Sequence, residues 1–201
     1  GIAKAKSEII ENIIKNGSIV LNADDKFYNY FKLKAKKRRL KIISFSKKNK
    51  SNIKLEKIIS FKNLSTIKIN INGRSKNFII KRNLEFYIEN ILASLAVISI
   101  YLDLNDINEK FFFNYNLPEG RGDYKYIKIN KKKIHLIDES YNSNPLSLKF
   151  AVKNFSKLQT HSKRKIILLG DMLELGKFSK KLHLDAAKIL NNTSINRVYV
   201  F

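Results

Sequence analysis

The chain has 201 residues, no cysteine, and 40 lysines and arginines against 17 aspartates and glutamates, which gives a formal net charge of +23. The absence of cysteine excludes disulfide bonds and thiolate metal sites, and no apolar run approaches the roughly 20 residues of a membrane-spanning helix. Hydrophobic residues make up 44% of the chain, so we expect a globular, soluble protein of the cytoplasm with one large or two small domains.

The positive charge raises nucleic-acid binding as one class of function, because lysine and arginine neutralise phosphates. The densest basic run, residues 32–39, follows four aromatic side chains at positions 27, 28, 30 and 31, so it combines a cationic surface with a stacking platform. The lysines are otherwise spread over the chain, as a compositional bias of the genome would produce. Solvated surface charge is therefore the expectation, and a basic nucleic-acid-binding module is the alternative.

Residues 2–15 predict an amphipathic helix. Its apolar face consists of residues at spacings of three and four, namely Ile2, Ala5, Ile9 and Ile13, with Ile10 and Ile14 alongside. Asn16 and Gly17 end this helix as C-terminal caps do. The apolar run 18–21 predicts a short buried strand, which leads into a polar turn at 22–25. Turns of this kind present ligand-binding groups in open α/β sheets.

A second helix is predicted over residues 26–37 and a second strand over residues 40–45. The side chains expected toward the core of this helix are Phe27, Tyr30, Phe31 and Leu33. The order strand, helix, strand indicates a crossover unit with parallel strands.

Apolar and polar residues alternate between positions 67 and 80, and the pair Asn72-Gly73 interrupts them. Both residues of this pair tolerate positive φ, so the pattern predicts a β-hairpin. Residues 85–101 then predict a well-packed helix. Its apolar side chains at helical spacing are Ile88, Ile91, Leu92, Leu95, Ala96 and Ile98. Asn105-Asp106 predicts the cap of one more short helix, which ends at residues 111–113.

The segment 116–122 contains one of the two prolines and two of the seven glycines. Such a cluster marks a break in regular structure, so we predict two domains, residues 1–116 and 117–201. The second should contain paired strands at 124–129 and 133–137, a helix at 145–158, a buried strand at 165–169, a helix at 180–190 and a strand at 197–201. This alternation implies a mainly parallel sheet and an α/β fold. No helix follows the last strand, so we expect the chain to be cut within a domain.

Three polar clusters follow apolar runs where the predicted strands end, at residues 22–25, 138–145 and 170–176. Carboxylates and carboxamides at these positions suit a polar ligand or a hydrated cation, and the neighbouring helix N-termini favour anions. Each cluster taken alone is more often a turn or a helix cap than a ligand site. Their recurrence at three strand ends favours a ligand site.

Five segments resemble the Mur ligases. Ser-Tyr-Asn-Ser-Asn-Pro at 140–145, Leu-Gly-Asp-Met-Leu-Glu-Leu-Gly at 169–176 and His183 are similar to the C-terminal domain of that family. Residues 3–9 and 21–25 resemble its central domain, and Gly120-Arg121-Gly122 resembles its inter-domain arginine segment. The resemblance covers essentially the whole chain. It implies the end of the Mur ligase central ATPase domain in residues 1–116, followed by a truncated Rossmann-like C-terminal domain in residues 117–201.

The resemblance implies an ATP- and Mg²⁺-dependent ligase of peptidoglycan synthesis that is cytoplasmic and monomeric and has no membrane or nucleic-acid partner. The two C-terminal motifs resemble the branch of the family that joins D-alanyl-D-alanine to UDP-N-acetylmuramoyl-tripeptide through an acyl phosphate. A ligase of the same superfamily with a different amino-acid substrate is the other enzyme that the resemblance allows.

The resemblance also implies roles for single residues. Lys6 is similar to a lysine that many of these ligases carry as a carbamate, which would be an oxygen ligand for a second Mg²⁺. Arg121 is similar to a residue that reaches the ATP phosphates, so these two are the expected catalytic residues. Asn22 resembles a residue near the adenine, Glu139 one near the ribose, and Asp25 shares the turn of Asn22. The residues expected to face the substrate are Ser143, Asn144, Asp171 and Glu174.

Without the resemblance, each of these residues has a simpler interpretation. Lys6 is a solvated helix lysine, Arg121 a surface charge, and the remaining residues are turn or cap residues. His183, which also matches the family, is then a helix residue that packs on the sheet.

Two features depart from the family pattern. The Gly-x-His-Asn pattern that often precedes the helix beginning near residue 88 is replaced by Leu84-Glu85-Phe86-Tyr87, although Asn90 still fits. No Gly-x-x-x-x-Gly-Lys-Ser/Thr loop for ATP phosphates occurs in the chain. We therefore expect this loop and the domain that grips the UDP end to lie upstream of Gly1, and the chain alone to be inactive.

Overall fold

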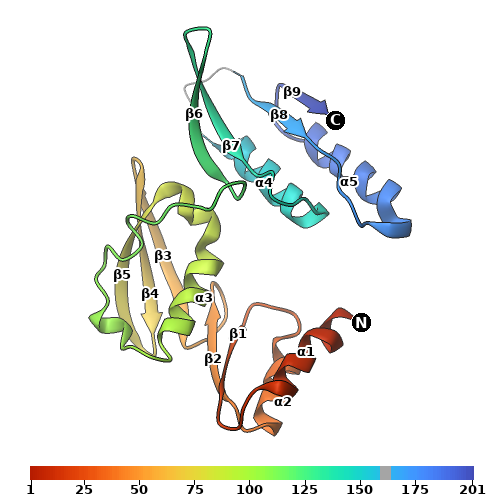
Figure 1. Ribbon diagram of the computed structural model, residues 1–201. Helices are drawn as coiled ribbons and strands as arrows, with labels where there is room; N and C mark the ends of the chain where they lie inside the picture. The colour runs from red at the N-terminus through yellow and green to blue at the C-terminus, as the bar shows by residue number, and fades with distance from the viewer. Residues whose placement is uncertain (159–163) are drawn as a thin grey trace. The chain divides into compact units, whose positions relative to one another are not determined.

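The computed structural model describes residues 1–158 and 164–201 (Figure 1). They divide into two compact units, Gly1–Tyr115 and Asn116–Phe201, and this division lies one residue before the predicted domain boundary. In the part of the chain that the structure describes, no helix is both long and apolar enough to cross a membrane.

The first unit is built on a five-stranded sheet with helices packed on it. Its elements are α1 (Ile2–Asn12), β1 (Ser18–Asn22), α2 (Tyr28–Lys37), β2 (Lys41–Ser46), β3 (Ile53–Phe61), β4 (Leu64–Ile71), β5 (Arg74–Lys81), the 3₁₀ helix η1 (Arg82–Tyr87), α3 (Ile88–Ile98) and the 3₁₀ helix η2 (Leu104–Asp106). The strand order follows the chain, with β1, β2 and β3 parallel and β3, β4 and β5 antiparallel. The predicted strand–helix–strand unit is confirmed.

The sequence did not predict β3. Its register against β4 shifts between Leu55 and Lys57, where a β-bulge places one extra residue in the strand. A bulge interrupts the alternation of the two faces, so the period of two that marks a strand in a sequence is lost here. The hairpin of β4 and β5 is confirmed, with Asn72 at φ 49° and Gly73 at φ 96° between the paired residues Ile71 and Arg74.

The α1 and α2 helices bury other residues than predicted. Ile2 and Ile9 of α1 are 76% and 67% exposed, whereas Ile10 is buried together with Ala35 of α2 and Leu40. The partly buried residues packed on these three are Ile13, Ile19, Phe31 and Ile42. The residues of α2 and its N-terminus predicted to be in the core but found exposed are Phe27, Tyr30 and Leu33. In α1, Ser7 accepts a hydrogen bond from Lys34 of α2, and Ile10 packs with Ala35 of α2. The buried side of α1 is therefore set by its contact with α2 and not by its most apolar face.

The α3 helix packs against β1, β2 and β3. It buries five of the six side chains predicted for its core face: Ile88, Ile91, Leu92, Leu95 and Ala96. The predicted short helix ending at residues 111–113 is wrong, because the structure has only the three-residue η2 and then turns. The side chains of Asp103 and Asn108 accept hydrogen bonds from the backbone N–H groups of Asn105 and Lys110, and such bonds favour turns over a helix.

The second unit contains β6 (Asp123–Ile129), β7 (Lys132–Asp138), α4 (Pro145–Lys157), β8 (Ile166–Leu169), the 3₁₀ helix η3 (Gly176–Phe178), α5 (Ser179–Asn191) and β9 (Arg197–Val200). The β6–β7 hairpin is antiparallel and forms a sheet of its own, whereas β8 and β9 are parallel and joined through α5. The predicted elements are therefore present, but the described strands of this unit do not join into one mainly parallel sheet.

The prediction that the strand at residues 165–169 is buried is wrong. Ile166 is 47% exposed and Leu168 is 67% exposed, and β9 is the one hydrogen-bonded neighbour of β8 among the described strands. An apolar run indicates a strand covered on both faces, and β8 is not covered in this way.

Candidate functional site

The polar turn at the end of β1 is held by the carboxylate of Asp24. The carboxylate accepts hydrogen bonds from the backbone N–H groups of Lys47 (2.6 Å), Lys48 (3.2 Å) and Asn49 (3.0 Å) and from the Asn49 side-chain amide (2.9 Å). Partial burial raises the pKa of Asp24, but the hydrogen bonds from Asn49, Lys47 and Lys48 outweigh burial and lower it overall. Asp24 thus ties the end of β1 to the loop after β2, a role that sequence analysis missed.

Asn22 and Asp25, both assigned to the nucleotide, lie in this turn. The Asn22 side-chain oxygen accepts a hydrogen bond from the Asp24 N–H (2.9 Å), and an Asp25 carboxylate oxygen accepts one from the Phe27 N–H (2.7 Å). These bonds are the turn-forming role that both residues have in the simpler interpretation. The turn is therefore preformed at the carboxyl end of a parallel strand, the edge at which open α/β sheets bind ligands.

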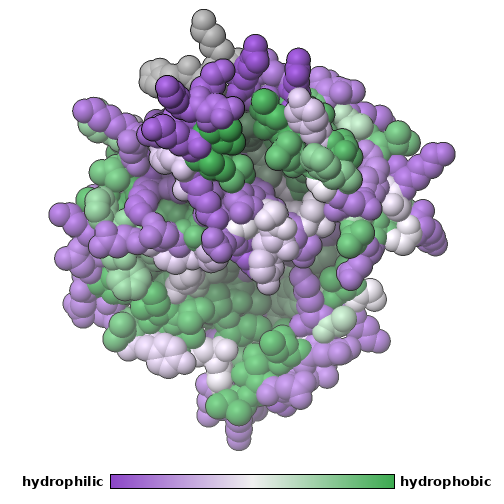
Figure 2. Space-filling model, turned by 45° about the horizontal axis from the view of Figure 1, so that its top comes forward, coloured by the Kyte–Doolittle hydropathy of each residue, from purple (hydrophilic) through white to green (hydrophobic). Residues whose placement is uncertain are grey.

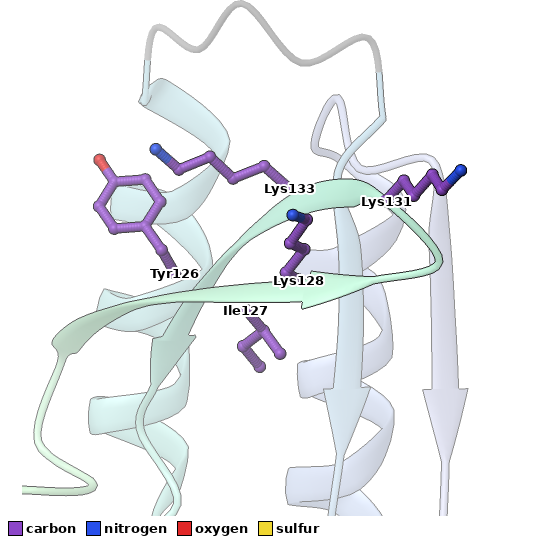
Figure 3. Close-up of a pocket in the computed structure, with 5 residues that line it drawn as sticks. All are labelled: Tyr126, Ile127, Lys128, Lys131 and Lys133. Carbon is purple, nitrogen blue, oxygen red and sulfur yellow. The ribbon is translucent and has the colours of Figure 1, made fainter.

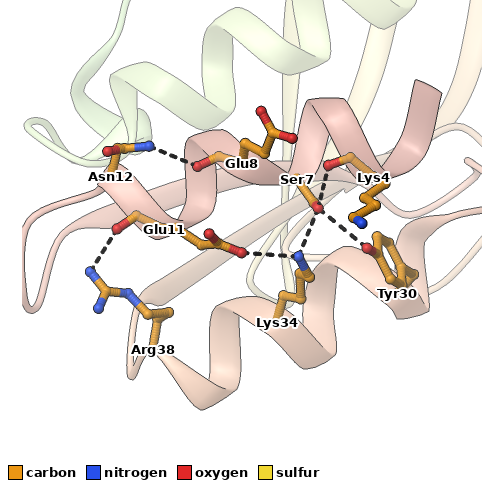
Figure 4. A network of polar contacts seen from close by, with 8 residues as sticks. All are labelled: Lys4, Ser7, Glu8, Glu11, Asn12, Tyr30, Lys34 and Arg38. Atoms are coloured by element: carbon orange, nitrogen blue, oxygen red, sulfur yellow. Dashed lines mark hydrogen bonds and ion pairs between the residues drawn. The ribbon is translucent and has the colours of Figure 1, made fainter. Parts of the chain in front are cut away.

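Lys6 is exposed on α1. The next residue, Ser7, is buried and lies at the centre of a polar network (Figure 4). The Ser7 hydroxyl donates to the Lys4 carbonyl (2.7 Å) and accepts from the Lys34 ammonium (2.9 Å). A hydroxyl has one proton and an ammonium only donates, so in the 3.3 Å contact between Ser7 and Tyr30 the tyrosine hydroxyl is the donor. This network fixes the helix that carries Lys6 against α2.

The same network uses part of the basic run at residues 32–39. Lys34 forms an ion pair with Glu11 (3.2 Å), and the hydrogen bond to Glu11 raises the pKa of Lys34. The Arg38 guanidinium donates to the backbone carbonyls of Glu11 (3.0 Å) and Ile13 (3.1 Å) at the end of α1. These two cations therefore hold α1 against α2, which weakens the interpretation of residues 32–39 as a cationic groove.

The visible face of the molecule in Figure 2 likewise has hydrophilic and hydrophobic side chains interspersed over it.

Arg121 lies in a glycine-flanked segment that runs beside the end of β7. Gly122 donates its N–H to the Asp138 carbonyl (2.7 Å), and the Tyr141 N–H donates to the Gly120 carbonyl (3.1 Å). Gly120 has φ +70°, and a Cβ there would lie 2.9 Å from the Tyr141 nitrogen, so this position requires glycine. The Arg121 guanidinium stacks on the Tyr141 ring, 4.1 Å from its centroid. The loop that carries Glu139 and Tyr141 therefore orients Arg121.

Carboxylates surround Lys125 at the base of the β6–β7 hairpin. Its ammonium lies 2.8 Å from Glu119, 3.2 Å from Asp123 and 3.9 Å from Asp138. The hydrogen bonds to Glu119 and Asp123 raise the pKa of Lys125, whereas hydrogen bonds from Ser140 lower the pKa of Asp138. Sequence analysis missed this charge cluster, because Glu119 lies outside the three polar runs and only the pairing of β6 with β7 brings Asp123 to Asp138.

The predicted substrate residues 143 and 144 lie at the start of α4. The Asn144 side-chain oxygen accepts hydrogen bonds from the N–H groups of Leu146 (3.0 Å) and Ser147 (2.9 Å), and the Ser147 hydroxyl accepts one from the Asn144 N–H (3.0 Å). This is a capping box. The helix cap is therefore Asn144.

Asp171 and His183 form a pair that joins the loop after β8 to α5. His183 Nε2 lies 2.8 Å from an Asp171 carboxylate oxygen, and Nδ1 lies 2.9 Å from the Ser179 carbonyl oxygen. Both of these oxygens can only accept, so the two hydrogen bonds form together in the doubly protonated imidazolium, whereas the Ser179 hydroxyl, 3.3 Å from Nδ1, can donate to a neutral ring. Accordingly, the hydrogen bond to Ser179 and then the one to Asp171 raise the pKa of His183.

Glu174 lies further along the same loop, with a left-handed backbone at φ 60°. Its side chain is exposed, while Met172 in the same loop is buried and anchors it. The left-handed backbone of Glu174 costs about 1–2 kcal/mol of conformational energy, because the residue has a Cβ. The sequence contains no signal for this feature.

The described residues do not form a magnesium site by themselves. Within residues 1–158 and 164–201, no three His, Cys, Asp or Glu side chains lie close enough together to hold a metal ion. A carbamate on Lys6 would add one oxygen-bearing side chain on the exposed surface of α1. Mg²⁺ prefers six oxygen ligands, so the residues present do not fit a complete site.

Comparison with known proteins identifies the family of the chain. Residues 1–98 match the model of the Mur ligase middle domain. The UDP-N-acetylmuramoyl-tripeptide–D-alanyl-D-alanine ligase of Buchnera aphidicola (subspecies Baizongia pistaciae) is 31% identical over 202 residues, and its counterpart from Rickettsia prowazekii is 30% identical over 203 residues. Each alignment covers 99% of this chain, but only 42% and 43% of the relative. The chain thus spans about two fifths of the length of these relatives.

Solved structures share the fold over the same range. A crystal structure of MurF from Acinetobacter baumannii matches 99% of the chain with a TM-score of 0.80 at 23% identity, and covers 42% of that protein. The MurF ligase of Thermotoga maritima in complex with ADP matches 100% of the chain with a TM-score of 0.77 at 20% identity, with 43% of that protein covered. At this level of identity, the likeness shows the fold.

Proposed function

Because the chain belongs to the Mur ligase family, we propose that it is part of an ATP-dependent ligase that adds D-alanyl-D-alanine to UDP-N-acetylmuramoyl-tripeptide in peptidoglycan synthesis. The observation that carries the proposal is the alignment of 99% of the chain, at 31% and 30% identity, with two ligases of that name. The similarity therefore extends through both units. In this proposal residues 1–116 end the central domain, residues 117–201 begin the C-terminal domain, and the enzyme is a cytoplasmic monomer.

The proposed reaction begins when the terminal carboxylate of the precursor takes the γ-phosphoryl group of ATP and ADP leaves. The dipeptide amine then attacks the acyl phosphate, phosphate leaves, and an amide bond forms. Negative charge on the transferring phosphoryl group needs cationic donors. In this proposal Arg121 is that donor, because stacking on Tyr141 uses the face of its guanidinium and phosphates are bound through the N–H edge.

The other predicted residues have narrower roles in this proposal. Asn22 and Asp25 shape the turn near the adenine, and Glu139 lies at the ribose. A second group belongs to the side of the site that faces the dipeptide: Ser143, Asn144, Asp171 and Glu174. A carbamylated Lys6 would supply one ligand to Mg²⁺, which would offset phosphate charge when bound. Because the described residues do not complete such a site, we assign Lys6 no further step.

The test uses the protein produced from its complete coding sequence. Phosphate release from ATP should require both UDP-N-acetylmuramoyl-tripeptide and D-alanyl-D-alanine. Arg121→Ala should lower kcat by about 10²–10³, as expected for the loss of a donor to transition-state charge, whereas Arg197→Ala on β9 should leave it unchanged. Phosphate release with another amino acid in place of the dipeptide would identify a different ligase of the superfamily, and no ATP-dependent turnover would overturn the proposal.

A further inference from the structure

The tip of the β6–β7 hairpin presents a basic and aromatic surface that the ligase function does not use. We define the hairpin patch as Tyr126, Lys128, Lys131, Lys133 and His135. Four of these residues and Ile127 line a cavity of about 310 Å³ (Figure 3). We propose that the hairpin patch binds single-stranded polynucleotide, with phosphates at the lysines and a base stacked near Tyr126. This function is additional to the proposed ligase activity.

The charges of the hairpin patch are not neutralised by the hairpin itself. Lys128 and Lys133 are directly opposite each other in the register, an arrangement of like charges that destabilises a strand pair. The sequence has no acidic residue between Asp123 and Asp138. No salt bridge among residues 1–158 and 164–201 includes a lysine of the patch, whereas Lys125 at the hairpin base has three carboxylates nearby. An anion bound at the tip would therefore relieve the repulsion between Lys128 and Lys133, which no carboxylate of the hairpin neutralises.

The aromatic residues of the patch lie among these cations. Tyr126 is 64% exposed, and its ring lies 4.2 Å from the Lys133 ammonium and 4.5 Å, edge to face, from the His135 ring. Surfaces that bind single strands combine a basic groove with exposed aromatic rings, because every base offers a face for stacking. The hairpin patch places both groups within one cavity.

The alternation of the hairpin favours a polynucleotide over an anionic membrane. Tyr126, Lys128 and Lys133 lie on one face, and Ile127, which pairs with Ile134, lies on the other (Figure 3). Insertion into a bilayer surface requires apolar side chains that lie beside the lysines and point in the same direction. Ile127 contributes to the cavity lining from the opposite face of the hairpin, so the face that carries the lysines has exposed aromatic rings beside them and no exposed aliphatic side chain.

The test measures the fluorescence anisotropy of a labelled oligothymidylate of about 16 nucleotides, the upper end of the site sizes of single-strand-binding folds. The variant combines Lys128→Gln, Lys131→Gln and Lys133→Gln. The matched control removes the same amount of positive charge from α2, with Lys32→Gln, Lys36→Gln and Lys37→Gln. The hairpin variant should weaken binding at least tenfold and reduce the salt slope by about 2, since each lost phosphate contact on a single strand removes about 0.7. The α2 variant should bind like the unmodified chain.

A second pair of variants tests stacking without a change of charge. Tyr126→Leu should weaken binding about tenfold, and Tyr126→Phe should retain it, because the phenyl ring still stacks. Circular dichroism establishes that each variant folds. Equal losses in the hairpin and α2 variants would show binding by net charge alone and overturn the proposal. The proposal would also be overturned, in favour of membrane binding, if the chain bound the oligonucleotide weakly and phosphatidylserine vesicles tightly, and if Tyr126→Leu left the vesicle binding unchanged.

Discussion

The two units of the chain differ in how completely they bury their apolar residues. Among the described residues, 21 buried hydrophobic side chains belong to the first unit and three, Val152, Met172 and Ala186, to the second. The first unit covers its sheet with α3, whereas in the second unit Ile166 and Leu168 of β8 are largely exposed. An apolar sequence therefore predicts burial only where the fold supplies a partner element.

The largest expected effect lies in the first unit. Leu95→Ala removes a fully buried side chain from α3 and should lower the free energy of unfolding by about 2–5 kcal/mol, through lost transfer energy and a residual cavity. Val97→Ala, at an exposed position of the same helix, should change it by less than about 0.5 kcal/mol. Urea unfolding followed by circular dichroism measures both. A small effect of Leu95→Ala would show that the core of the first unit is not tightly packed.

A smaller effect is expected in the second unit, between one buried and one exposed side chain. Val152 of α4 is buried and Leu168 of β8 is exposed. Val152→Ala should cost about 1–2 kcal/mol, because it removes two buried carbon atoms at about 0.8 kcal/mol each. Leu168→Ala deletes more carbon atoms, but from an exposed position, and should cost less than about 0.5 kcal/mol. Urea unfolding of both variants measures the two losses of unfolding free energy and shows which is larger. A larger loss for Leu168→Ala would mean that this face of β8 is covered in solution.

The cap of α4 provides a smaller effect that depends on hydrogen bonds and not on core packing. Asn144→Ala removes the acceptor for two backbone N–H groups and should cost about 1 kcal/mol, whereas Asn144→Asp should retain most of the stability. Thermal unfolding compares them, with Asn142→Ala as the control outside the cap. Equal melting temperatures for Asn144→Ala and Asn142→Ala would contradict the capping role.

The smallest effect is the pH dependence contributed by His183. Its pKa in the folded chain is raised above the ordinary value of 6.5, first by Ser179 and then by Asp171. Its stabilising contribution is therefore complete below pH 6.5 and is lost as the pH rises through the folded-state pKa. His183→Gln should flatten the dependence of melting temperature on pH in this window. An NMR titration that gives a folded pKa at or below 6.5 would contradict the imidazolium pair.

Local signals in the sequence predicted much of this fold. The hairpin at Asn72-Gly73, the apolar stripe of α3 and the start of α4 at Pro145 each depend on a few neighbouring residues, and each is confirmed. The β3 strand was missed because its bulge breaks the local period. The exposure of Ile2 and Ile9 depends on which partner α1 meets, which no local pattern encodes.

The candidate sites were only partly predicted from the sequence, because their contacts join residues that are distant along the chain. The polar turn after β1 was predicted. The hydrogen bonds that Asp24 accepts were not, because their donors in residues 47–49 lie 23 to 25 positions further along the chain. The stack of Arg121 on Tyr141 and the pair of Asp171 with His183 likewise join separate segments. The left-handed backbone of Glu174 has no sequence signal at all.

The strand connections also have a consequence for the order of folding. The turns at residues 62–63 and 72–73 join β3, β4 and β5 within the chain, whereas β1 pairs with β2 only across α2. Closing a short loop costs less entropy and is faster than closing a long one. We therefore expect the three-stranded meander to form first and to template the parallel strands. Pulse-labelling hydrogen exchange during refolding should protect the Ile67 and Ile69 amides before that of Ile43.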